Sequence, residues 1–112
     1  MKYKVELTQD ARLDLLAIIE FYQQTAGDSI AKSMLAVIQT ALESLEELPT
    51  RGHKPHELHS IRTATELEVI VDRYRIIYLL KNETVFVIAI FDGRQDVKAH
   101  LSKRRSRLYQ KI

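Results

Sequence analysis

Three apolar segments in the second half of the chain limit its fold most tightly. They are "LEVIV" (67–71), "YRIIYLL" (74–80) and "TVFVIAIF" (84–91), and only two or three residues separate one from the next. Such β-branched and aromatic residues favour strands, and links this short favour hairpins. The third segment is apolar at nearly every position, which is typical of a central strand covered on both faces. The sequence therefore predicts a β-meander over residues 67–91.

The first half of the chain predicts a strand followed by two helices. Residues 3–7 alternate between apolar and charged side chains, as in a strand with one buried face. Thr8 is expected to cap a first helix, and Asp28 or Ser29 a second one that continues to Pro49. Apolar side chains recur at three- and four-residue steps in both segments, so the two helices should form an antiparallel hairpin that packs on a sheet.

A last helix is predicted from about residue 95 to 109. Its core contacts are expected to be Val97, Leu101 and Leu108, with basic side chains around them. The chain should thus adopt an α+β fold in the order β-α-α-β-β-β-α, as a single domain over residues 1–112. Its antiparallel sheet of about four strands should carry the N-terminal helical hairpin on one face, with the short C-terminal helix in addition.

Composition narrows the class of protein further. The chain has 112 residues, 46% of them hydrophobic and 29% charged, and it contains no cysteine. No apolar run approaches the roughly 20 residues that a membrane-spanning helix needs, and the first residues do not form a secretory signal. We therefore expect a cytoplasmic protein that does not contact the membrane and has neither disulfides nor a thiolate metal site.

Positive charge is concentrated at the C-terminus. Residues 1–49 hold four Lys or Arg against eight Asp or Glu, whereas residues 94–112 hold seven against one. An acidic partner, with nucleic acid as the first candidate, would explain this tail, and so would a solvated helix face.

The segment "FDGRQDVKAH" (91–100) spaces Asp92, Asp96 and His100 at four-residue intervals, as metal ligands on one helical face would be. Gly93 interrupts the backbone there, so we expect Asp92 to form a turn and Asp96 to begin the last helix. No metal and no cofactor are predicted.

Three loop histidines repeat every third residue, His53, His56 and His59, beside Pro55. Proline makes a helix improbable there, so exposure to solvent is the ordinary interpretation. The alternative is that one of them, with Lys54 or Glu57, performs acid–base chemistry on a phosphodiester.

Arg73 and Arg75 flank Tyr74 and should share one face of a strand. They could pair with acidic residues of the neighbouring strand, or they could bind a ligand. The acidic candidates are Glu66, Glu68 and Asp72. Motifs for a serine hydrolase or a glycine-rich phosphate loop are absent from the sequence.

Four segments together resemble the toxin subunits of ParE/RelE-type toxin–antitoxin modules. They are "ELTQDARLDLLAIIEFY", "LEELPTRG", "YRIIY" and "VFVIAIFDGRQDVKAHLSKR", and they extend from about residue 3 to 108 in the family's element order. The resemblance implies a type II toxin neutralised by a cognate antitoxin, and it allows two activities.

RelE-like members cut messenger RNA on the ribosome without a metal. Under that alternative Arg94 would stabilise the phosphate charge, and His100 or Lys54 would transfer the proton. However, "EVIV" stands where the family's strand arginine is expected, and the tyrosine that many RelE-like members carry after the final strand is missing.

ParE-like members poison DNA gyrase, and their closing segment commonly has the form Arg-x-Asp-Leu/Val followed by a helix with a leucine. Arg94, Asp96, Val97 and Leu101 fit that spacing, so we favour this activity, for which no catalytic residue is expected. The predicted target-binding residues are Arg94, Asp96, Lys103, Arg104, Arg105, Arg73 and Arg75.

The implied antitoxin would contribute a segment that folds on the toxin. Leu13, Leu16 and Phe21 on the first helix are candidate contacts, or else they belong to the core. A third alternative is a non-toxic protein whose only role is to bind its antitoxin.

Overall fold

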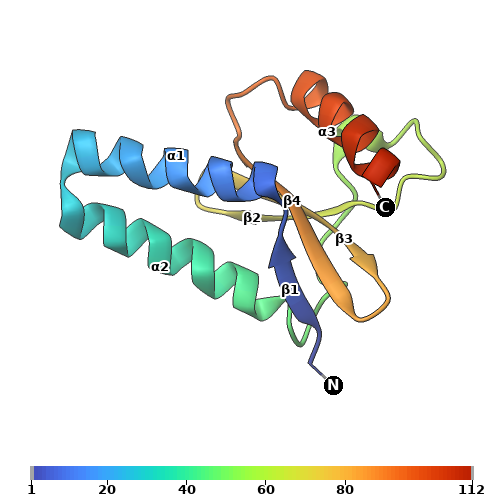
Figure 1. Ribbon diagram of the computed structural model, residues 1–112, viewed down its shortest axis with the longest axis horizontal. Coiled ribbons are helices and arrows are strands. Elements are labelled where there is room, and N and C mark those ends of the chain that lie inside the picture. The colour runs from blue at the N-terminus through green and yellow to red at the C-terminus, as the bar shows by residue number, and fades with distance from the viewer. Residues whose placement is uncertain (1, 112) are drawn as a thin grey trace.

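The computed structural model describes residues 2–111 and contains three α-helices and one four-stranded sheet (Figure 1). The elements follow the predicted order, which confirms the α+β class. They are β1 (Lys4–Leu7), α1 (Gln9–Ala26), α2 (Asp28–Ser44), β2 (Leu67–Val71), β3 (Tyr74–Lys81), β4 (Thr84–Asp92) and α3 (Val97–Lys111), with a short 3₁₀ helix at His56–Leu58. None of the helices in this part of the chain is long and apolar enough to cross a membrane.

The strands lie in the order β1-β4-β3-β2. The meander is antiparallel as predicted, and β1 joins it parallel to β4, with Val5 opposite Val85, so the complete sheet is mixed. Asp72 and Asn82 supply the positive φ angles of 55° and 57° in the two hairpin links. Asp and Asn tolerate that conformation better than other non-glycine residues, which explains why these links can be so short.

Two apolar layers cover the sheet, one on each face. The helical hairpin packs on one face, and α3 with the loop before β2 packs on the other (Figure 1). Alternation along β3 sends Ile76 and Tyr78 to the hairpin side, and Ile77 and Leu79 to the α3 side. Both faces of β3 and β4 are buried, which accounts for their nearly continuous apolar sequences.

A bulge in β4 changes which side chains face the helical hairpin. Ile77 pairs with Ala89 and Tyr78 pairs with Val87, so Ile88 is the extra residue. After the bulge, Ile90 faces the hairpin and Phe91 faces α3. Because side chains alternate in a regular strand, Phe91 would otherwise lie on the hairpin side with Val85 and Val87.

The helix boundaries correct two details of the sequence prediction. Thr8 caps α1 as expected, since its hydroxyl accepts a hydrogen bond from the Ala11 N–H at 3.3 Å. Gly27, with φ of 93°, is the N-cap of α2 in place of Asp28 or Ser29. Helix α2 also ends at Ser44, before Pro49: the backbone turns there, and the N–H of Leu45 bonds to the Leu42 carbonyl.

Candidate functional site

The end of β4 forms a compact turn that holds Arg94 in place. The carboxylate of Asp92 accepts hydrogen bonds from the Arg94 backbone N–H at 3.0 Å and from its Nη2 at 3.1 Å. These bonds lower the pKa of Asp92 and raise the pKa of Arg94. The Arg94 side chain is nevertheless 76% exposed, so its guanidinium remains open to a ligand.

The rest of the Arg-x-Asp-Val segment fastens α3 to the sheet. Asp96 caps the helix, since its Oδ1 accepts a hydrogen bond from the Ala99 N–H at 3.2 Å. Val97 is buried on the α3 side together with Leu101, and Phe91 lies in the same apolar cluster. Within this segment, Asp96 and Val97 therefore have structural roles, and Arg94 is the residue available for contact.

Arg73 occupies the link between β2 and β3 and points back toward α1. Its guanidinium lies 5.5 to 5.9 Å from the ring centroids of Phe21, Tyr22 and Tyr74. Its Nε is also 3.4 Å from Oδ2 of Asp92, so Arg73 and Arg94 share one carboxylate. The hydrogen bond with the Tyr74 hydroxyl raises the pKa of Arg73. Cation–π contacts of this kind hold the guanidinium at a fixed position.

Between α1 and the ends of β3 and β4 lies an open pocket of about 220 Å³. We call it the Arg73–Arg94 pocket. Its lining residues are Asp14, Ala17, Ile18, Phe21, Arg73, Tyr74, Ile90, Asp92, Arg94 and Gln95. Ala17, Ile18, Phe21 and Ile90 form the apolar part of this lining, and its charged groups are Asp14, Arg73, Asp92 and Arg94. The sequence placed Phe21 in one predicted interface and the arginines in another, but the fold brings them together.

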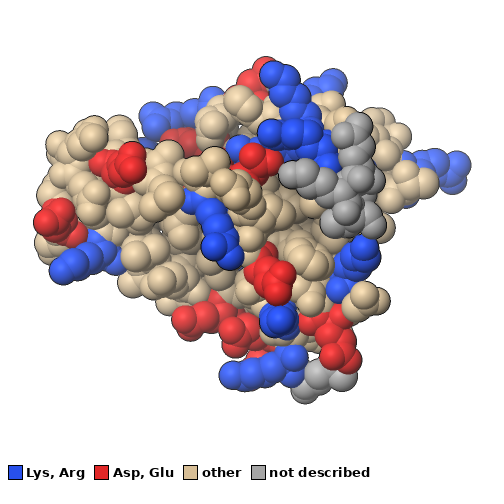
Figure 2. Space-filling model, viewed as in Figure 1, with Lys and Arg blue, Asp and Glu red and all other residues tan. Residues whose placement is uncertain are grey.

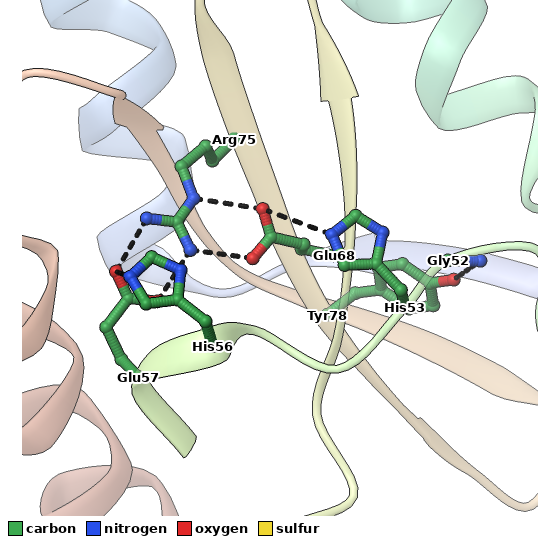
Figure 3. A network of polar contacts seen from close by, with 7 residues as sticks. All are labelled: Gly52, His53, His56, Glu57, Glu68, Arg75 and Tyr78. Atoms are coloured by element: carbon green, nitrogen blue, oxygen red, sulfur yellow. Dashed lines mark hydrogen bonds and ion pairs between the residues drawn. The ribbon is translucent and has the colours of Figure 1, made fainter. Parts of the chain in front are cut away.

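The second strand arginine, Arg75, is held between two carboxylates (Figure 3). Its Nη2 lies 2.6 Å from Oε1 of Glu57 and 2.6 Å from Oε2 of Glu68. The pair with Arg75 lowers the pKa of Glu57 to about 2 and raises the pKa of Arg75. The imidazoles of His53 and His56 lie beside Glu68 and Glu57, at 3.9 and 3.3 Å. We call these five residues the Arg75 network.

The Arg75 network joins β3 to the loop that follows α2. Residue His53 bridges to Glu68 through two backbone hydrogen bonds, of 3.0 and 2.7 Å, along the outer edge of β2. Two features of the sequence predictions are therefore met: Arg75 pairs with Glu68 on the adjacent strand, and the loop histidines are exposed. Glu57 was not predicted as a partner of Arg75, because no sequence pattern indicates where a long loop will fold back.

Three arginines of α3 form ion pairs within the protein. Arg104 donates to Asp14, with Nη2 to Oδ1 at 2.8 Å, and its guanidinium also lies 4.6 Å from the ring centroid of Phe91. Arg105 pairs with the buried Glu66, and Arg107 lies 3.0 Å from Asp10. The first two arginines are less than one-fifth exposed, at 15% and 19%.

Basic side chains gather around α3, whereas acidic and basic side chains are mixed over the hairpin and near β1 (Figure 2). Lys103 is exposed on α3. Of the predicted target-binding cations, Arg73, Arg94 and Lys103 remain accessible, the first two beside Asp92. Arg75, Arg104 and Arg105 are mostly buried in their ion pairs.

The three candidate residues for ribonuclease activity each have a separate environment. Lys54 Nζ donates to the Ile61 carbonyl at 2.7 Å, and Arg94 is bonded to Asp92. The imidazole of His100 lies tilted against Phe91, with ring centroids 5.9 Å apart. Neither Lys54 nor His100 lines the Arg73–Arg94 pocket. Within residues 2–111, no cluster of three or more His, Asp or Glu side chains is arranged to hold a metal ion.

The three candidate antitoxin contacts on α1 lie outside the core. Leu13 is 55% exposed, Leu16 is 56% exposed and Phe21 is 48% exposed. The buried side of the helix is formed instead by Ala11 and Ile18. An outward apolar surface of this kind is available to a partner.

Comparison with known proteins agrees with this fold. The family model described as "ParE toxin of type II toxin-antitoxin system, parDE" matches residues 5–97. A chain of the chromosomal ParDE toxin–antitoxin system from P. aeruginosa has a TM-score of 0.67 at 15% identity, over 81% of this chain and 96% of that chain. A chain of the RelBE2 toxin–antitoxin complex from Mycobacterium tuberculosis has a TM-score of 0.57 at 23% identity, over 82% and 99%.

No curated protein sequence matches the chain. At these identities the two structures share its fold, while the family model covers most of its length. The chain therefore belongs to the ParE toxin family of type II toxin–antitoxin systems.

Proposed function

We propose that this toxin inhibits growth by poisoning DNA gyrase and that a cognate antitoxin neutralises it. The match to the ParE family over residues 5–97, which includes the Arg94–Val97 segment, carries the proposal. Arg73, Arg94 and Lys103 present exposed positive charge from the sheet end and α3. A gyrase–DNA complex presents acidic groups, both protein carboxylates and DNA phosphates, so accessible cations would favour binding to it.

The charge of the sheet face beside α3 is less suited to cutting RNA. Arg75, the arginine that β3 presents there, is bonded to both Glu57 and Glu68, so the three groups together carry one net negative charge. Cleavage by 2′-hydroxyl attack needs positive groups that stabilise a developing oxyanion. A guanidinium already shared by two carboxylates is a weak source of such stabilisation.

The outward face of α1 is the surface on which we place the antitoxin. Leu13, Leu16 and Phe21 are each about half exposed there. A segment that folds into an amphipathic helix on binding can cover apolar side chains of this spacing. The two similar structures named above belong to toxin–antitoxin systems, which supports a partner of that kind.

Incubation of the purified toxin with gyrase, ATP and supercoiled plasmid tests the proposal. Trapped cleavage complexes should release linear DNA after detergent and protease treatment. A parallel reaction with translating ribosomes should leave the messenger RNA intact. Codon-phased RNA cuts without linear DNA would establish the ribonuclease alternative, and a chain inert in both reactions and harmless on expression would establish the binding-protein alternative.

A charge variant links the effect to the accessible cations. Replacing Arg73, Arg94 and Lys103 by Gln should lower the yield of linear DNA by about tenfold while the fold remains intact. The matched control replaces three exposed cations elsewhere by Gln. These are Lys4, Lys32 and Arg62. Equal losses in the two variants would show that net charge, and not this surface, is responsible.

A further inference from the structure

In the Arg73–Arg94 pocket, two guanidiniums share the carboxylate of Asp92. Arg73 directs Nε toward Asp92 and Nη2 toward the Tyr74 hydroxyl, and Arg94 directs Nε and Nη2 toward Asp92. A guanidinium has five N–H groups, so most of those on Arg73 and Arg94 remain available among the described residues. Arg73, Arg94 and Asp92 together carry one net positive charge. Asp14, which also lines the pocket, does not change this sum because it is paired with Arg104.

Beside these charged groups, the pocket has an apolar lining. It is formed by Phe21, which is 48% exposed, and by Ala17, Ile18 and Ile90. The volume of about 220 Å³ is below the 300 to 1,000 Å³ that is usual for a whole small-molecule site. It is suited to a single large side chain, held beside a charged contact.

We propose that this pocket binds a segment of a partner protein in which a large apolar side chain lies next to a carboxylate. The side chain would enter between Phe21 and Ile90, and the carboxylate would accept hydrogen bonds from Arg73 and Arg94. The carboxylate can belong to an Asp or Glu side chain or to a chain terminus, because the guanidiniums recognise either. Arg73 is already held by three aromatic rings, so binding costs little ordering of its side chain.

The surroundings of the pocket favour a peptide over a nucleic acid. Residues 1–49 hold eight Asp or Glu against four Lys or Arg, and Glu20 directly precedes Phe21 on α1, while Asp10 and Asp14 are paired with Arg107 and Arg104. Duplex DNA has one negative charge per roughly 1.7 Å of axis, far more than the one net positive charge at this pocket can balance. A single carboxylate balances that charge, and the apolar part of the pocket suits a neighbouring side chain of a peptide.

This inference deepens the role proposed above for Arg73 and Arg94, and it rests on that role only in requiring that they contact a partner. Its test contains no gyrase, so the two ideas can fail separately. The probe is the peptide acetyl-Gly-Phe-Asp-Gly-amide, titrated into the isotopically labelled full-length toxin and followed by NMR. Comparison arms are the Phe-Asn peptide, a peptide ending in a free Phe carboxylate, and a short oligothymidylate.

We expect saturable shift changes at the amides of Ala17, Phe21 and Gly93 and at the Nε–H groups of the two arginines. The Phe-Asp peptide should bind about fivefold more tightly than the Phe-Asn peptide. Arg94→Gln should remove this preference, whereas Arg62→Gln, at an exposed position outside the pocket, should keep it. Phe21→Ala should weaken both peptides alike, and Leu16→Ala, on the same helix and similarly exposed, should not.

Equal binding of the Asp and Asn peptides would overturn the proposal, as would shift changes confined to other surfaces. If oligothymidylate displaced the peptides and bound more tightly than they do, the site would be a nucleic-acid contact instead. Tighter binding of the peptide with the free terminal carboxylate would support the proposal and identify a chain terminus as the natural ligand.

Discussion

Asp14 and Arg104, 90 residues apart in the sequence, form an ion pair beside the bulge in β4. The Asp14 carboxylate accepts a hydrogen bond from the Ile90 N–H at 2.9 Å, and Arg104 Nη1 donates to the Ile88 carbonyl at 3.2 Å. A bulge leaves backbone groups without their ladder partners, and buried groups of that kind are costly unless they are bonded. This ion pair thus provides hydrogen-bond partners for the backbone at the bulge, and it links α1 to α3.

Replacing Asp14 by Asn should therefore destabilise the protein more than an ordinary surface change. Both side chains of the pair are 15% exposed, so loss of the charge leaves Arg104 poorly compensated. We expect the free energy of unfolding to fall by about 2 to 3 kcal/mol, measured by urea unfolding. Glu20→Gln, on the exposed side of α1, should change it by less than about 0.5 kcal/mol. Similar effects for the two variants would contradict the structural role of the pair.

Acid should weaken the fold through Glu57. Its pKa is about 2 in the folded protein, below the ordinary value of 4.5, because Arg75 donates to it. A depressed folded-state pKa contributes stability above the unfolded-state value and loses it as the pH falls toward the folded-state value. The contribution, about 2 to 3 kcal/mol at neutral pH, should disappear between about pH 4.5 and pH 2.

The Glu57→Gln variant isolates this contribution. It should be less stable than the unmodified protein at pH 7, and the two stability curves should converge near pH 2 in urea unfolding. Curves that stay parallel across this interval would mean that Glu57 is not the responsible group.

Gly52 should not tolerate a side chain. A Cβ placed there would lie 2.6 Å from the Glu68 carbonyl oxygen and 2.6 Å from the Tyr78 hydroxyl, which itself accepts a hydrogen bond from the Gly52 N–H. Gly52→Ala must therefore push the loop off β2, at a cost of about 1 to 3 kcal/mol. Gly93→Ala meets only ordinary contact with the Arg73 carbonyl at 3.4 Å and serves as the control in thermal unfolding. Equal melting temperatures for the two variants would argue against this close approach.

Neutralisation by the antitoxin should be separable from toxicity. Leu13→Asp with Leu16→Asp places charge on the outward face of α1, where it leaves the core undisturbed. We expect antitoxin affinity to fall about hundredfold in calorimetry, while growth inhibition persists and is no longer rescued by the antitoxin. Leu48→Asp, 61% exposed in the segment that follows α2, should leave rescue unchanged. If the antitoxin still prevented growth inhibition by the Leu13→Asp, Leu16→Asp variant as it does for Leu48→Asp, the outward face of α1 would not be part of the antitoxin interface.

The fold followed from local patterns because each element carries its own signal. The period-two alternation of β1, the helical spacing in α1 and α2, and the short links of the meander all act within a few residues of the chain. The parallel placement of β1 had no such signal, since an isolated four-residue strand can pair on either side. Gly27 as the N-cap of α2 was missed because Asp28 and Ser29 are better caps by side-chain chemistry.

The candidate site was harder to predict than the fold. The turn at Asp92 was expected from Gly93, and the pairing of Arg75 with an acidic residue of the neighbouring strand was one of two alternatives. The Arg73–Arg94 pocket depends on Phe21, 52 residues before Arg73, and no spacing rule connects them. The bulge at Ile88 was also invisible, because an unbroken apolar run conceals where alternation changes phase.

The pairing of β1 with β4 has a consequence for how the toxin matures during synthesis. Residues 4–7 of β1 pair with residues 84–87 of β4, so β1 cannot pair until more than two-thirds of the chain has been synthesised. Long-range pairing of this kind is a late step in folding, whereas the α1–α2 hairpin is local and can form early. A chain that stops before β4 would therefore contain the helical hairpin and the β2–β3 pair without the strand that joins β3 to β1. Such a fragment would lack Asp92 and Arg94, and the cell would be exposed to the complete surface only after translation has almost finished.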